Sequence, residues 1–203
     1  MLAVIGGSGF YTLAAFEDVE QIKQSTPYGE VSSPISFFSL KNESNNTQFC
    51  FLARHGVNHS IPPHKVNYRA NIFALKSLGV TKVIAVNAVG SCNSAMKVGD
   101  YVLVDQCIDY SYGREHTFHD TLSSFQDHID FTVPVSMDLH QQISDTFDTL
   151  NIAHHSSGVY ACTQGPRFET AAEVRRIQRD GGDVIGMTTV SYTHLRAHET
   201  WSY

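Results

Sequence analysis

Short apolar runs recur along the chain, and most of them end in glycine or small polar residues. Runs of this length, bounded by turn-forming residues, predict strands. They cover residues 2–5, 35–40, 49–53, 80–86, 101–104, 158–162 and 184–187. Residues 66–78 are rich in helix formers and stop at Gly79, and residues 139–150 carry an apolar stripe at helical spacing that predicts core packing. Thr170 followed by Glu173 is a capping box that starts a third helix. This alternation of strands with helices predicts an α/β fold.

Composition narrows the class of protein. With 203 residues, of which 42% are hydrophobic and 17% charged, the chain is expected to fold as one globular domain with a substantial core. The net charge of -6 offers no basic surface for DNA or RNA, so we expect no nucleic-acid partner.

The cysteines and the N-terminus indicate a compartment. The four cysteines are widely spaced and form no C-x-x-C pair, which argues against a disulfide framework and a zinc ribbon and favours free thiols. The first apolar run has no basic leader and is too short for a signal or membrane segment. We therefore expect a cytoplasmic protein without a membrane partner.

Two strand ends carry residues suited to binding an anion. The first apolar run breaks into Gly6-Gly7-Ser8-Gly9, but it matches neither a dinucleotide loop, because Thr12 replaces the third glycine, nor a P-loop, because no lysine follows. An ordinary turn and a phosphate loop both remain open. Residues 87–91, Asn-Ala-Val-Gly-Ser, repeat the device after the fourth run. Strand ends of an open α/β sheet converge, so the two loops are expected to share a crevice.

Arg54 and His55 follow the third apolar run and add a guanidinium and an imidazole. With the strand-end residues Ser8, Asn87 and Thr188, they would supply several donors to one phosphate. In the alternative interpretation, Arg54 forms a surface salt bridge and His55 is an ordinary loop histidine. Spacing alone favours this alternative over a phosphate site.

Other catalytic patterns are weak. His55 and His59 have helical spacing, but Gly56 and the two prolines that follow oppose a helix, and no H-E-x-x-H occurs, so no metal is expected. The sequence Arg114-Glu115-His116 has no G-x-S-x-G nucleophile elbow to accompany it. Phe168 either stacks on a flat ligand or belongs to the core.

Six ordered motifs resemble those of the methylthioadenosine/purine nucleoside phosphorylase family. They lie at residues 5–9, 53–56, 66–71, 87–91, 164–169 and 186–188. Within the family, Asn87, where threonine is more usual, and residues 112–117, 128–131 and 158–163 are similar to the bacterial S-methyl-5'-thioinosine phosphorylase branch.

The resemblance implies a single-domain phosphorylase fold with a mixed central sheet flanked by helices. It implies phosphorolysis of S-methyl-5'-thioinosine to hypoxanthine and 5-methylthioribose 1-phosphate in purine salvage, by a homotrimer or homohexamer. Inorganic phosphate is then a co-substrate, and no metal or organic cofactor is needed. The alternatives are an S-methyl-5'-thioadenosine or general purine nucleoside phosphorylase, an inactive fragment that binds phosphate or nucleoside, and a Rossmann-like protein that binds another ligand.

The resemblance also implies roles for matching residues. The phosphate ligands would be Ser8, Arg54, His55, Asn87, Ala88 and Thr188. Phe168 would lie against the purine and Met187 against the ribose, while His59 and a neighbouring subunit's His128 would lie near the 5'-methylthio group.

The resemblance stops near Val190. We expect a nucleoside phosphorylase domain over residues 1–190 and a non-native tail over residues 191–203, which look like translated sequencing-adapter readthrough. The family's catalytic Asp or Asn, which acts at purine N7, is expected to lie in a C-terminal portion absent from this chain.

Overall fold

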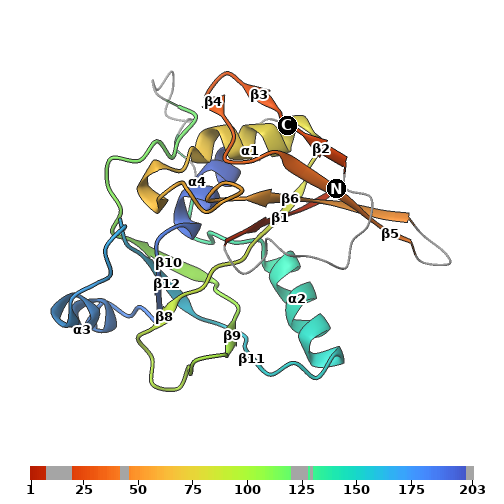
Figure 1. Cartoon of the computed structure of the whole chain (residues 1–203). Coiled ribbons are helices and arrows are strands. Elements are labelled where there is room, and N and C mark those ends of the chain that lie inside the picture. Colours follow the sequence, from red (N-terminus) through yellow and green to blue (C-terminus); the bar gives the residue numbers. More distant parts are fainter. Residues whose placement is uncertain (8–19, 42–45, 120–127, 129, 200–203) are drawn as a thin grey trace. The chain divides into compact units, whose positions relative to one another are not determined.

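The computed structural model describes residues 1–7, 20–41, 46–119, 128 and 130–199 (Figure 1). These residues form two compact units that divide between Ala88 and Val89. Both units combine strands with helices, so the predicted α/β class is confirmed.

The first unit is built on a mixed five-stranded sheet in the order β2-β5-β6-β1-β7. β1 pairs in parallel with β6 and with β7, whereas β5 is antiparallel to both β6 and β2. The strands are β1 (Leu2–Gly6), β2 (Glu20–Ile22), β5 (Ile35–Lys41), β6 (Asn46–Ala53) and β7 (Lys82–Ala85). A separate ribbon consists of β3 (Ser25–Thr26) and β4 (Gly29–Glu30).

The central position of β1 explains its apolar sequence. Ala3 and Ile5 are fully buried, as expected for a parallel strand with a neighbour on each side. The predicted strands at 35–40 and 49–53 are confirmed as a hairpin whose pairing runs out to Lys41 and Asn46. The turn between them, residues 42–45, lies outside the described residues.

Helix α1 (Tyr68–Ser77) lies within the stretch 66–78 that the sequence predicts as helical. The Asn67 side chain accepts a hydrogen bond from the Ala70 amide at 3.1 Å, which caps the N-terminus. Gly79 follows the helix with a φ of +78°, a conformation that favours glycine. A 3-10 turn, η2 (Pro63–Lys65), precedes the helix.

The second unit contains a four-stranded sheet in the order β10-β12-β13-β8. Its parallel strands are β10 (Gln106–Asp109), β12 (Val159–Cys162) and β13 (Val184–Gly186), and β8 (Gly90–Ser91) is antiparallel to β13. β9 (Tyr101–Val102) and β11 (His154–His155) form a parallel pair. The helices are α2 (Met137–Thr149), α3 (Ala171–Arg179) and α4 (Thr189–Glu199).

The helices of this unit agree with the sequence in part. The capping box of Thr170 and Glu173 is present at the start of α3. The apolar stripe of α2 does not form a buried core, because Leu150 is 61% exposed and Leu139, Ile143 and Phe147 are only half-buried. Helix α4 runs across the boundary expected at Val190, so the origin of residues 191–203 stays a prediction.

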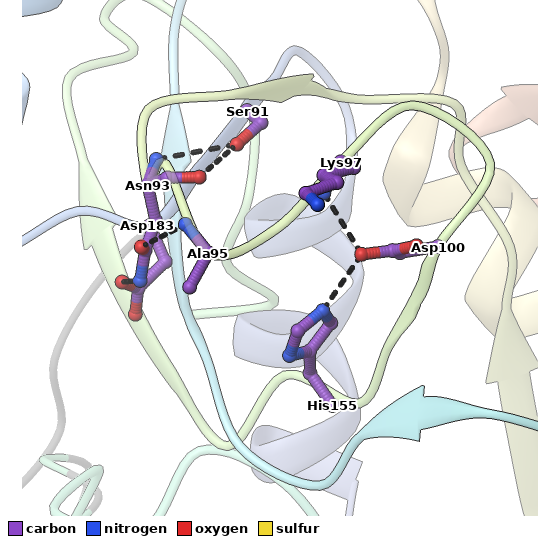
Figure 2. Close-up of polar contacts among 7 residues, drawn as sticks. All are labelled: Ser91, Asn93, Ala95, Lys97, Asp100, His155 and Asp183. Carbon is purple, nitrogen blue, oxygen red and sulfur yellow. Dashed lines mark hydrogen bonds and ion pairs between the residues drawn. The ribbon is translucent and has the colours of Figure 1, made fainter.

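Asp183 fixes the segment that follows β8 (Figure 2). Its carboxylate accepts hydrogen bonds from the Asn93 side-chain amide at 2.8 Å and from the Val159 amide at 2.9 Å. The Asn93 side chain in turn accepts from the Ala95 amide at 3.0 Å, and the Ser91 hydroxyl donates to the Asn93 carbonyl at 2.8 Å. One carboxylate thus joins the 91–95 turn to strand β12.

Asp100 makes a second set of contacts in the same figure. It accepts from the Lys97 amide at 2.8 Å and lies 2.9 Å from Nε2 of His155 (Figure 2).

The four cysteines are free thiols, as predicted. None of the described helices is both long and apolar enough to cross a membrane.

Candidate functional site

Arg54 lies where three parallel strands end. It directly follows β6, and its amide donates to the Gly6 carbonyl at the end of β1 at 3.0 Å. Its Nη2 donates to the carbonyl of Val86, just past β7, at 3.3 Å. The predicted convergence of strand ends in the first unit is therefore confirmed for β6, β1 and β7.

The guanidinium of Arg54 is buried and incompletely paired. The residue is only 3% exposed, so the surface salt bridge that spacing alone favoured is wrong. Its Nη1 has no hydrogen-bond partner among the described residues. A buried cation with an unused donor is costly, and an anion placed beside it would remove that cost.

Gly7 allows this arrangement. A Cβ at Gly7 would lie 2.9 Å from Nη2 of Arg54, a separation that real Cβ atoms essentially never show. The second glycine of the first loop therefore permits a close approach between the guanidinium and the backbone that follows β1. Ser8, the next residue and a predicted phosphate ligand, lies outside the described residues.

His55 is buried and held on both sides of its ring. Its Nδ1 lies 2.7 Å from the Ile61 carbonyl, and Nε2 lies 3.4 Å from Nε of Arg54. Because a carbonyl only accepts and the arginine Nε only donates, this network assigns a neutral ring with its proton on Nδ1. Burial lowers the pKa of His55, the Ile61 hydrogen bond opposes this effect, and the nearby Arg54 and His59 lower the pKa further.

His59 completes this group in the first unit. Its ring centroid lies 4.5 Å from that of His55, and its backbone has a φ of +52°. Asn87 and Ala88 come directly after Val86, whose carbonyl binds Arg54; Asn87 is half-buried and Ala88 exposed. The structure thus brings Arg54, His55 and His59 together after β6, and the Asn87 loop follows β7, which is separated from β6 in the sheet by β1.

Thr188 and Met187 follow β13 in the second unit. Thr188 is 4% exposed, and its amide donates to the hydroxyl of Tyr160 at 3.2 Å. A Cβ at Gly186 would lie 2.7 Å from Cζ of Tyr160, so this tyrosine packs directly against the strand. Tyr160 therefore fixes residues 186–188, which include the predicted ribose and phosphate contacts Met187 and Thr188.

Phe168 lies on the loop between β12 and α3. It is 84% exposed, so the alternative that it belongs to the core is wrong. The neighbouring Arg167 forms a two-pronged ion pair with Glu173, at 2.7 and 2.9 Å. His128, the other predicted nucleoside contact, is exposed and stands between segments outside the described residues.

Sequence reasoning gave Arg114 no role, yet it is a buried arginine of the second unit. It is 9% exposed and donates to the carbonyls of Met187, Thr163 and Gln164 at 2.8 to 3.0 Å. Met187 and Gln164 belong to segments that are predicted to bind the nucleoside, and Thr163 directly precedes Gln164. Within the described part of the chain, no group of three or more His, Cys, Asp and Glu side chains is arranged to hold a metal.

Taken by their geometry, these features define a mixed α/β protein with a buried, incompletely paired arginine at the ends of parallel strands. Comparison with known proteins gives the family. Residues 1–198 match the profile described as "Phosphorylase superfamily". A 6-oxopurine nucleoside phosphorylase of Pyrococcus furiosus is 46% identical over 192 residues, which are 92% of this chain and 70% of the relative.

Two further proteins agree. A probable S-methyl-5'-thioinosine phosphorylase of Xylella fastidiosa is 45% identical over all of this chain and 80% of its own length. The structure of a methylthioadenosine phosphorylase from Schistosoma mansoni in complex with tubercidin matches with a TM-score of 0.87 and 31% identity, over 96% of this chain and 75% of that one. The chain belongs to the phosphorylase superfamily, in the nucleoside phosphorylase family that its motifs resemble, and is an enzyme of the pentosyltransferase class.

Proposed function

We propose that this enzyme cleaves S-methyl-5'-thioinosine with inorganic phosphate and releases hypoxanthine and 5-methylthioribose 1-phosphate. The observation that carries the proposal is the buried Arg54, whose Nη1 has no partner among the described residues and which lies at the ends of β6, β1 and β7. A dianion such as phosphate matches this donor in charge and in geometry.

The phosphate is proposed to bind the six residues that the family resemblance indicates. Arg54 supplies the charge, and each charge-assisted hydrogen bond contributes about 1.5–3 kcal/mol. His55, Asn87 and Ala88 complete the ligands of the first unit. Ser8 and Thr188 are proposed as the remaining ligands on the strength of their positions in the motifs.

In the proposed reaction, a phosphate oxygen forms a bond to the anomeric carbon while the bond from that carbon to the purine nitrogen breaks. The purine leaves with the electron pair and takes up a proton, and positive charge develops on the sugar as in glycoside hydrolysis. Because phosphate is itself the nucleophile, the protein has to position the anion and stabilise the charges. We propose that the reaction needs no metal or organic cofactor.

Substrate recognition is proposed for the second unit and for His59. Phe168 is exposed on its loop and free to lie against a purine, and Met187 precedes the buried Thr188. His59 and a neighbouring subunit's His128 are proposed to lie near the 5'-methylthio group. The 6-oxopurine named for the Pyrococcus relative and the thioinosine named for the Xylella relative support a 6-oxo substrate.

The test is a comparison of two nucleosides. Purified chain is incubated with S-methyl-5'-thioinosine or S-methyl-5'-thioadenosine, with and without phosphate, and the released base is separated by chromatography. A chimera in which residues 191–203 are replaced by the C-terminal portion of the Xylella relative is assayed in parallel. Phosphate-dependent release of hypoxanthine supports the proposal. Preferential release of adenine assigns an S-methyl-5'-thioadenosine phosphorylase instead.

We also propose a cytoplasmic homotrimer or homohexamer, which the family resemblance supports. Light scattering coupled to gel filtration measures the mass in solution. A monomer at micromolar concentration would contradict this part of the proposal.

A further inference from the structure

We propose that Arg114 is a positioning residue for nucleoside binding, because it holds the loop that carries Phe168 and the segment that carries Met187 in one fixed arrangement. The inference rests on the proposed function, in which these two segments bind the purine and the ribose. Arg114 is not proposed to touch the substrate.

The guanidinium joins its own loop to two other stretches of the chain, residues 163–164 and 187–191. Nη1 donates to the Met187 carbonyl at 2.8 Å, and Nη2 donates to the carbonyls of Thr163 and Gln164 at 3.0 and 2.9 Å. Nε donates to the Gln164 side chain at 3.1 Å, and Nη1 also lies 3.4 Å from the Ser191 hydroxyl in α4. The loop after β10 is thereby joined to the ends of β12 and β13.

Only an arginine can make this set of contacts. Its donors lie in one plane and point in fixed directions, whereas a lysine has a single nitrogen at the end of a flexible stem. The Gln164 side chain is fixed further, because the same oxygen also accepts from the Tyr112 amide at 3.2 Å. The backbone of Gln164, the first residue of the predicted purine-binding loop, therefore has little freedom.

The contacts are not needed to hold the sheet together. The ends of β12 and β13 are already joined by the Thr163 amide, which donates to the Gly186 carbonyl at 2.8 Å. The Thr163 hydroxyl also donates to Glu169 at 2.6 Å. Loss of Arg114 would thus leave the strand pairing in place and release the Gln164 backbone and the Met187 carbonyl. These are the parts that precede Phe168 and Thr188.

The test compares Arg114→Lys and Arg114→Ala with Arg175→Ala, a matched control because Arg175 is exposed on α3 of the same unit. We expect kcat/KM for the nucleoside to fall on the order of 100-fold in both Arg114 variants. A displacement of about 1 Å in a group that positions the substrate can cost this much. The KM for phosphate should change less than about 2-fold, because Arg54 and His55 are held by their own hydrogen bonds in the first unit and the Thr188 amide is held separately by the Tyr160 hydroxyl. Added guanidinium at low, non-denaturing concentration should restore part of the activity of Arg114→Ala.

Hydrogen exchange provides a readout that does not depend on activity. In Arg114→Lys, the amides of residues 164, 165, 167–169 and 187 should exchange faster than in the wild type, while the Thr188 amide and strand β12 keep their protection. Equal loss of protection through β12 and β13 would show a merely structural role, and so would equal rises in both KM values. Wild-type kinetics and exchange in Arg114→Lys would overturn the inference outright. If the wild type releases no base, the proposed function fails, while the exchange pattern still decides whether Arg114 fixes these segments.

Discussion

Replacing Arg54 with methionine separates its role in binding from its role in folding. The guanidinium is 3% exposed, its Nη1 has no partner among the described residues, and its Nη2 is 3.3 Å from the Val86 carbonyl. Nη1, and the second N–H of Nη2, are therefore available to a phosphate. If each makes one charge-assisted hydrogen bond worth about 1.5–3 kcal/mol, their loss weakens phosphate binding by about 3–6 kcal/mol, or roughly 10²- to 10⁴-fold.

The same substitution should cost the unligated protein little stability. Methionine fills a similar volume and removes a buried charge, and replacing buried charges by apolar side chains is often neutral or stabilising by about 1–4 kcal/mol. The carbonyl of Val86 and Nε2 of His55 each lose one long hydrogen bond, which partly offsets this gain. We therefore expect a midpoint of unfolding equal to or above that of the wild type in phosphate-free buffer.

The assay measures thermal unfolding with and without phosphate, together with the KM for phosphate at saturating nucleoside. Wild-type protein should be stabilised by phosphate, because a ligand that binds only the native state raises the unfolding free energy. Arg54→Met should lose this shift, whereas the control Arg179→Ala, at an exposed position on α3, should keep it. A strongly destabilised Arg54→Met that still binds phosphate normally would refute the reasoning.

Three further predictions concern residues around the proposed sites. Burial holds the pKa of His55 below its ordinary value of 6.5, so on acidification the unfolded state binds a proton at this ring before the folded state does. The free energy of unfolding should therefore fall as the pH drops below 6.5, until the pKa of the folded state is reached. In a series of denaturations at different pH, His55→Gln should flatten this part of the curve. Gly186→Ala should destabilise by about 1–3 kcal/mol in urea unfolding, since its Cβ would meet the 2% exposed Tyr160, and unchanged stability would show that the ring can move. Asp183→Ala should lower the free energy of unfolding by about 1–3 kcal/mol, because the Asn93 side chain and the Val159 amide lose their shared acceptor. Hydrogen exchange at the Val159 amide should accelerate, and a wild-type rate there would contradict the role given to Asp183.

Local signals in the sequence were sufficient for most elements. The glycine after α1 and the capping box of α3 depend on neighbours within a few residues, so they could be predicted. The ends of β1 and β7 could be predicted as well, because in both an apolar run breaks into small residues, which is a local signal. The two-residue strand β8 was not predicted, since its pairing with β13 joins residues more than 90 positions apart.

The environment of the arginines was beyond sequence reasoning. Arg54 and Arg114 lie in loops, where arginine is ordinarily exposed, and both are buried by contacts that the local sequence does not specify. The hydrogen-bond partners of Arg114 named above are separated from it by 49 to 77 residues, and they are backbone carbonyls, an amide side chain and a hydroxyl, not acids. No charge pattern marks such partners. The α2 stripe shows the opposite limit, because apolar periodicity indicates which face is apolar and not how deeply it is buried.

The most direct test of the central claim is the base released from the two methylthio-nucleosides in the presence of phosphate. The account predicts release of hypoxanthine from S-methyl-5'-thioinosine that requires phosphate and is lost in Arg54→Met. Release that does not depend on phosphate, or that persists in Arg54→Met at unchanged phosphate KM, would contradict it.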